Sequence, residues 1–166
     1  MNLFDLLHES HERQRQLTRQ LTSARASAAT REAVFLQLKV ELEAHAAAEE
    51  RFLYVPMLMT DGGLLASRHA LSEHHDIDEL CEELSVSDKS GDAWLETAKA
   101  LSHKVRHHLK EEESKFFKVA GRLISDPQKA LLAKRYQKDL LRMRKKGAEE
   151  FATLVVGRDG QVGLAD

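Results

Sequence analysis

The sequence predicts an all-α protein, an up-down-up-down antiparallel four-helix bundle with an additional C-terminal helix. Apolar residues recur at helical spacing through four long segments. Short turn clusters separate these segments, and short connections force neighbouring helices to run antiparallel. The 166 residues include only 8 Gly and 2 Pro, which leaves little room for the many turns of an all-β fold.

The four bundle helices can be placed from their turns and caps. Asp61-Gly62-Gly63 forms one turn and residues 87–91 form another. Either Ser27 or Thr30 caps the second helix. The expected helices cover about residues 3–26, 31–58, 64–84 and 92–123.

A fifth helix is expected to follow the bundle. In Ser125-Asp126-Pro127, Asp126 is the expected cap and Pro127 the first helical residue, and the helix runs to about residue 151. The chain is therefore divided into a bundle at 1–124, a basic amphipathic helix at 125–152 and a flexible tail at 153–166.

The fifth helix has an apolar stripe on an otherwise basic surface. We interpret it as a helix that packs on the bundle or on a second copy of the chain in a homodimer. The alternative is a docking surface for an acidic protein partner. The stripe is Leu132, Tyr136, Leu140 and Met143, and the basic residues are Lys129, Lys134, Arg135, Lys138, Arg142, Arg144, Lys145 and Lys146.

Side chains of the metal-ligand type recur at a constant offset of 63 residues. Three such positions of the first half return in the second, together with the leucines around them, and the alignment needs no gap. The resulting candidate metal ligands are His11, His45, Glu49, His74, His108 and Glu112.

These six side chains are expected to meet in one layer of the bundle. His11 and His45 lie about equally far from the first interhelical turn, and His74 and His108 about equally far from the third. His45 and Glu49 are four residues apart, so both lie on one face of a helix, and the second half repeats this spacing.

Apolar residues continue the faces that hold these ligands. An unpaired, ionised Glu in such a seam would cost roughly several kcal/mol, so a buried cation is its natural partner. The expected inward residues are Leu38, Leu42, Leu53 and Pro56 on the second helix and Leu101, Val105, Phe116, Val119 and Leu123 on the fourth.

The same register separates the other histidines from the site. His8, three residues before His11, stays open as a ligand or as a residue that supports one. A ferritin-like site is disfavoured, because it needs Glu three residues before each helical His ligand. We assign to solvent the remaining histidines, which lie off the apolar faces or lack a motif: His69, His75, His103 and His107.

Charge and composition exclude several classes of function. A formal net charge of −2 gives no overall bias toward nucleic acid. No apolar stretch of membrane-spanning length is present, so no membrane is expected and the cytoplasm is the expected location. The single cysteine, Cys81, cannot form an internal disulfide and is interpreted as a small buried apolar residue.

The order of these motifs resembles the hemerythrin-like HHE cation-binding family over about residues 3–123. The resemblance implies two non-haem iron ions with an oxo or hydroxo bridge, held by four His and two bridging Glu. Zinc or manganese could use the same N and O ligands. The matching order is His11, His45-x3-Glu49, His74 and His108-x3-Glu112, with Glu50 and Glu113 following the glutamates.

The chain departs from the oxygen-carrying members of that family. They have a second histidine where this chain has Asp78, so the resemblance implies an open position on each iron. Asp78 is expected to accept a hydrogen bond from a ligand or water, or to coordinate weakly. This pattern is more similar to the reactive branch, which includes the F-box iron sensor and di-iron proteins implicated in repair.

The expected function is to bind or sense a small molecule, namely dioxygen, nitric oxide or peroxide. The alternative is a catalyst that turns over peroxide or nitric oxide, or an iron donor in the repair of damaged iron centres. Both use the same open coordination positions, so the sequence does not separate them.

Overall fold

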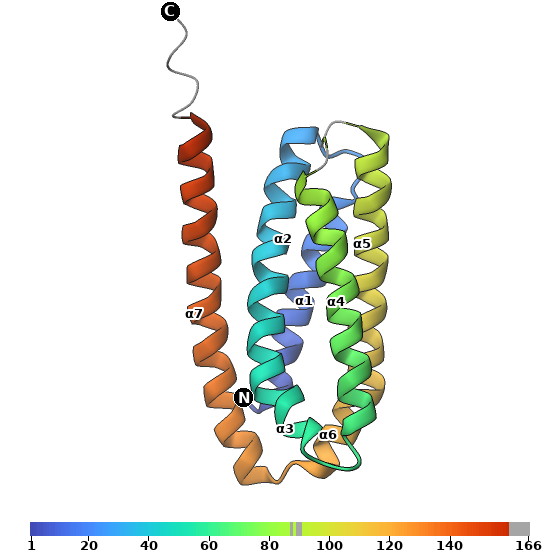
Figure 1. The fold of residues 1–166 in the computed structure, drawn as a ribbon, viewed down its shortest axis with the longest axis vertical. Helices are drawn as coiled ribbons and strands as arrows, with labels where there is room; N and C mark the ends of the chain where they lie inside the picture. Colours follow the sequence, from blue (N-terminus) through green and yellow to red (C-terminus); the bar gives the residue numbers. More distant parts are fainter. Residues whose placement is uncertain (87, 89–90, 160–166) are drawn as a thin grey trace, which may run out of the picture.

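The computed structural model describes residues 1–86, 88 and 91–159, without the side chains of residue 86 and residues 154–159. It confirms the all-α bundle, whose four main helices alternate in direction (Figure 1). Of the expected turn at 87–91, residues 87, 89 and 90 lie outside the described residues. The helices are α1 (Leu3–Leu21), α2 (Ala28–Glu49), α4 (Leu64–Val86) and α5 (Asp92–Glu111).

Two of the expected continuous helices contain a π-helical turn. After α2 come η1 (Glu50–Tyr54) and α3 (Val55–Leu58), and after α5 come η2 (Glu112–Phe116) and α6 (Phe117–Leu123). A π turn holds an extra residue, so the face that points inward shifts by one position beyond it.

This shift corrects the predicted core beyond each glutamate. On α6 the buried residues are Phe117 and Ala120, whereas the expected Val119 is only partly buried and Leu123 is 41% exposed. After η1 the same displacement buries Met57 in place of the expected Pro56. An unbroken α-helix would have kept the predicted stripe.

The helix ends follow from local capping. Ser27 caps α2, with its hydroxyl accepting from the Thr30 amide. The first helix ends at Leu21, before the predicted residue 26. The cap of the last helix also differs from the prediction, because Ser125 and Gln128 form a reciprocal capping box in which Asp126 is only the first helical residue.

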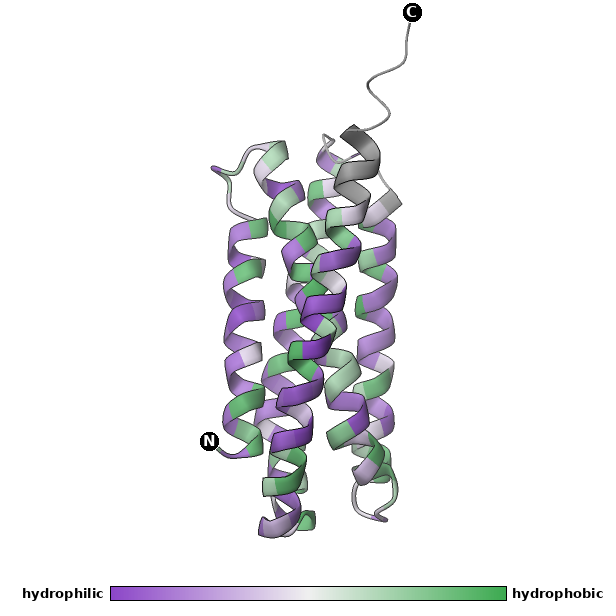
Figure 2. Cartoon of the chain, turned by 90° about the vertical axis from the view of Figure 1, so that its left-hand side faces the viewer, coloured by the Kyte–Doolittle hydropathy of each residue, from purple (hydrophilic) through white to green (hydrophobic). Residues whose placement is uncertain are grey.

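The last helix, α7 (Asp126–Asp159), packs on α2 and α1. Its predicted apolar stripe faces the bundle, where Tyr136 and Leu140 are buried. Arg144 of α7 also pairs with the buried Glu41 of α2 at 2.6 Å. The outward face of α7 is mostly hydrophilic (Figure 2). The helix continues into the expected tail, and residues 160–166 lie outside the described residues.

Two apolar clusters fill the bundle along its length. One includes Leu7, Leu53 and Phe116, and the other includes Leu38 and Leu101. The candidate ligands lie near the boundary between these two clusters, so apolar residues pack on both sides of them. Along the described part of the chain, no helix combines the length and apolar character needed to cross a membrane.

Candidate metal centre

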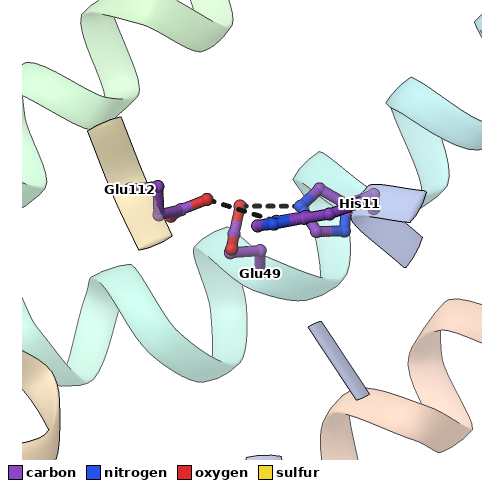
Figure 3. A group of neighbouring side chains, drawn as sticks. His11, Glu49 and Glu112 are labelled. Carbon is purple, nitrogen blue, oxygen red and sulfur yellow. Dashed lines mark ion pairs between the residues drawn. The ribbon is translucent and has the colours of Figure 1, made fainter. Parts of the chain in front are cut away.

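The structure brings the six candidate ligands together in one buried layer. The Oε2 atom of Glu49 lies 3.1 Å from His45 Nε2 and 3.4 Å from His74 Nε2. The Oε2 atom of Glu112 lies 3.4 Å from His11 Nε2 and 3.7 Å from His108 Nε2. Each carboxylate therefore faces one histidine from each half of the repeat. Figure 3 shows Glu49 and Glu112 approaching the His11 ring from different elements.

Several inward atoms of this layer have no hydrogen-bond partner. They are buried, and an unsatisfied buried polar atom costs about 1–3 kcal/mol, or more when it is charged. Carboxylate oxygens and imidazole nitrogens are common ligands of first-row transition metals. The layer therefore fits a bound cation. Within the described chain, the unpartnered atoms are His11 Nε2, His45 Nε2, both carboxylate oxygens of Glu49 and Glu112 Oε2.

The ligand atoms fall into two overlapping groups. Within each group, all ligand atoms lie within 4.8 Å of one another. The groups share Glu49, which is the arrangement that two neighbouring cations bridged by a carboxylate require. One group is His11, His45, Glu49 and Glu112, and the other is Glu49, His74 and His108.

Each of the four histidines turns Nδ1 outward to a fixed partner. His11 Nδ1 lies 2.8 Å from Glu113 Oε1, and His74 Nδ1 lies 3.0 Å from Glu50 Oε1. Such contacts fix the tautomer that leaves Nε2 free to bind a metal. Glu50 and Glu113 each follow a candidate ligand, so the repeated motif already pointed to them.

The other two outer partners had no signal in the sequence. His108 Nδ1 lies 3.3 Å from Glu73 Oε1. His45 Nδ1 lies 3.0 Å from the hydroxyl of Tyr136, which comes from α7. Three histidines thus face carboxylates, whereas His45 faces a neutral phenol. A neutral partner raises the basicity of an imidazole less than a carboxylate does, so the two halves of the centre differ electronically.

Tyr136→Phe is expected to weaken metal binding about 10- to 100-fold, because His45 Nδ1 loses its partner and its ring is no longer held in orientation. Competition with a chelator of known affinity would measure this change. Leu132→Ala, on the same face of α7, is the matched control for packing. Equal metal affinity in Tyr136→Phe and the unaltered protein would show that α7 plays no part in the centre.

Charge is balanced within the layer through raised histidine pKa values. Burial alone would lower the pKa of His11, but the facing carboxylates of Glu112 and Glu113 outweigh it and raise the pKa to about 9. Burial would also lower the pKa of His74, but the facing carboxylates of Glu49 and Glu50 outweigh it and raise the pKa to about 10. Both imidazoles are therefore protonated at neutral pH without metal.

Metal uptake at pH 7 is expected to release protons, because a metal binds only neutral imidazole. A pH indicator in weakly buffered, anaerobic solution should record one proton each from His11 and His74 as Fe²⁺ is added. Their raised pKa values stabilise the metal-free fold fully below about pH 6.5, and this stability is lost as the pH rises through 9 to 10. Uptake without proton release would contradict this charge balance.

The remaining predicted positions lie at the edge of the site. His8 is half exposed, and its Nδ1 atom lies 3.1 Å from Glu113 Oε1. It therefore contacts a carboxylate that supports His11 and does not enter the layer. Asp78 has an exposed side chain, and its expected contact with a ligand or water stays a prediction. As predicted, the histidines assigned to solvent are exposed: His69, His75, His103 and His107.

Two cavities and the side chain of Tyr54 lie beside the layer. The Tyr54 hydroxyl donates to Glu112 Oε1 and lies 3.3 Å from His74 Nε2. A groove of about 290 Å³ reaches His108 and Glu112 from between α4 and α5. A smaller cavity of about 10 Å³ touches His45, His74 and His108, with Asp78 also in its wall.

Comparison with known proteins identifies the fold and the family. The structure is similar to that of a Hemerythrin HHE cation binding domain-containing protein from Mycobacterium kansasii, with a TM-score of 0.80 and 21% sequence identity. The match covers 92% of this chain and 93% of that chain, and it is a likeness of fold. No curated protein matches the chain. The family model described as Hemerythrin HHE cation binding domain matches residues 2–120, and the protein therefore belongs to the hemerythrin HHE cation-binding family.

Proposed function

We propose that this protein holds two non-haem iron ions at the six-residue layer and there binds or senses a small molecule, namely dioxygen, nitric oxide or peroxide. An iron pair would supply reversible redox chemistry and open coordination positions. The chain would supply Glu49 and Glu112 as bridging ligands. His11 and His45 would hold one ion, and His74 and His108 the other.

The observation that carries this proposal is the convergence of buried, unpartnered atoms from both halves of the repeat. Glu49 faces His45 and His74, while Glu112 faces His11. In the metal-free protein the protonated His11 and His74 balance these carboxylates, and a metal cation would take over that role once the imidazoles are neutral. Two carboxylates and four neutral imidazoles match the preferences of iron.

The cavities support a small ligand. A volume of about 10 Å³ corresponds to roughly one water-sized group, which excludes an organic substrate from the space beside His45, His74 and His108. The larger groove, lined by apolar residues such as Ala70 and Phe116, provides a route from the surface to Glu112. Binding of a molecule of two or three atoms is therefore the function that the site supports best.

One observation favours turnover of peroxide as a second candidate. Tyr54 is fully buried, and its hydroxyl donates to Glu112 Oε1. Burial raises the pKa of this phenol well above its usual value, so the hydroxyl keeps its proton. It is thus a neutral hydrogen-bond donor next to the centre, which could stabilise charge that develops on a leaving oxygen.

One experiment tests the proposal and separates its two forms. Aerobically purified protein is expected to contain about two iron atoms per chain. The protein is then reduced without oxygen, and its absorbance is followed as dioxygen, nitric oxide or peroxide is added. If the spectrum of the reduced protein returns when the added molecule is removed, the result supports binding. Consumption of many equivalents of the added molecule without damage to the protein supports catalysis. Protein that acquires no iron would overturn both forms.

The basic surface of α7 remains a candidate contact for an acidic protein partner. Its apolar stripe packs on the protein's own bundle, which leaves the exposed face for such a contact. Several basic residues there are already paired within the chain, including Arg142 with Asp139 at 2.6 Å. We propose the remaining exposed basic residues as the contact for an acidic partner or for a second copy of the chain.

A further inference from the structure

Gln14 is a buried amide without a partner beside the candidate centre. It lies on α1 one helical turn after His11 and is 1% exposed. Its Nε2 atom has no hydrogen-bond partner in the described part of the chain. A buried N–H group without an acceptor is unfavourable, so a donor left in this state points to a partner from outside the chain.

The cavity of about 10 Å³ lies against this side chain. Its wall combines Gln14 with three imidazoles of the layer, and each of these has its outer nitrogen held by another residue. Leu42 and Ile77 make much of the remaining wall apolar. Gln14 is therefore the neutral side chain in this wall that can donate a hydrogen bond to a molecule in the cavity.

The internal repeat shows that packing alone does not require an amide here. The offset of 63 residues relates Gln14 to Ile77, just as it relates His11 to His74. Ile77 is also buried and lines the same cavity. Because an apolar side chain fills the equivalent position, the amide calls for a reason other than packing.

We propose that Gln14 donates a hydrogen bond to the small molecule that occupies this cavity, and so positions that molecule at the metal centre. The ligand class is a molecule of two or three atoms with an oxygen or nitrogen acceptor beyond the atom that binds the centre. This inference rests on the proposed function, because it needs iron in the layer.

Azide provides a linear probe with an acceptor at each end, and only its terminal atom needs to enter a space of roughly one water-sized group. Iron-loaded, oxidised protein is titrated with azide, with absorbance reporting affinity and infrared spectroscopy reporting the azide stretching frequency. Gln14→Met keeps the length of the side chain and removes the donor. It is expected to bind azide about tenfold more weakly, as loss of one hydrogen bond implies, and to shift the stretching frequency.

Ile77→Val is the matched control, since it changes the apolar wall of the same cavity at the equivalent position. It should retain the azide stretching frequency of the unaltered protein. Gln14→Leu is a second variant without the donor, and all variants are checked for iron content. Unchanged affinity and frequency in both Gln14 variants, loss of iron from both, or iron-loaded protein that binds no azide would overturn the inference. Failure of the unaltered protein to take up iron would overturn the proposed function as well.

Discussion

Glu49→Gln is expected to lower the iron content from about two atoms per chain to one or fewer. Glu49 Oε2 faces a histidine from each half of the repeat, His45 at 3.1 Å and His74 at 3.4 Å. An amide oxygen is a weaker ligand than a carboxylate, and it leaves the cationic pair with one negative charge less. Metal analysis of aerobically purified protein measures the result directly.

The same variant is expected to be less stable without metal. Burial would raise the pKa of Glu49, but the facing His45 and His74 rings lower it well below its usual range. The carboxylate is therefore charged in the metal-free protein and balances the protonated His74. Removing this charge leaves a buried cation without its counter-charge, which lowers the melting temperature.

Glu79→Gln provides the control for the loss of a negative charge, because Glu79 is exposed and pairs with the exposed His75. It should keep both its iron and its melting temperature. Glu112→Gln should reproduce the effect of Glu49→Gln, since Glu112 faces the layer from the other half. Full iron content in both variants would show that neither carboxylate binds a metal.

The candidate site could be found from the sequence because its residues obey two simple periodicities. Helical spacing puts His45 and Glu49 on one face, and the offset of 63 residues repeats that pair in the second half. Both rules depend on backbone geometry that is uniform up to the glutamates. The structure accordingly places all six candidate ligands in one layer.

Prediction was wrong where the backbone leaves the regular helix. The π turns begin at Glu50 and Glu112, and hydrophobic periodicity assumes the same number of residues in every turn. The expected burial of Val119 therefore fell one position away from the fully buried Ala120. A π turn beside a buried polar layer is a tertiary feature, and local propensity does not record it.

The contact between Tyr136 and His45 also could not be predicted from the sequence. These residues are 91 positions apart, and Tyr136 belongs to a helix outside the repeat. Its place in an apolar stripe predicted burial correctly, but periodicity cannot tell which buried group a phenol will meet. The same limit applies to Gln14, whose missing partner is visible only once the surrounding side chains are placed.

His108→Ala is expected to remove most of the bound iron, whereas His107→Ala should leave iron content and absorbance nearly unchanged. His108 is 2% exposed, with Nε2 in the layer and Nδ1 next to Glu73. Alanine there removes a proposed metal ligand and leaves the carboxylates with one imidazole fewer. Metal analysis and the visible spectrum of the two variants provide the comparison.

His107 and His108 are adjacent, so this pair of variants tests which face of α5 points into the bundle. The side chain of His107 is 61% exposed, and its Nε2 atom lies 3.5 Å from Glu111 at the surface. Its removal is expected to change stability by about 0.5 kcal/mol or less, as is usual for exposed positions. Loss of iron from His107→Ala with retention in His108→Ala would mean that α5 presents the other face to the layer. Glu112 lies four residues after His108 and would then turn away from Glu49, so the bridging arrangement would fail together with the choice of histidine.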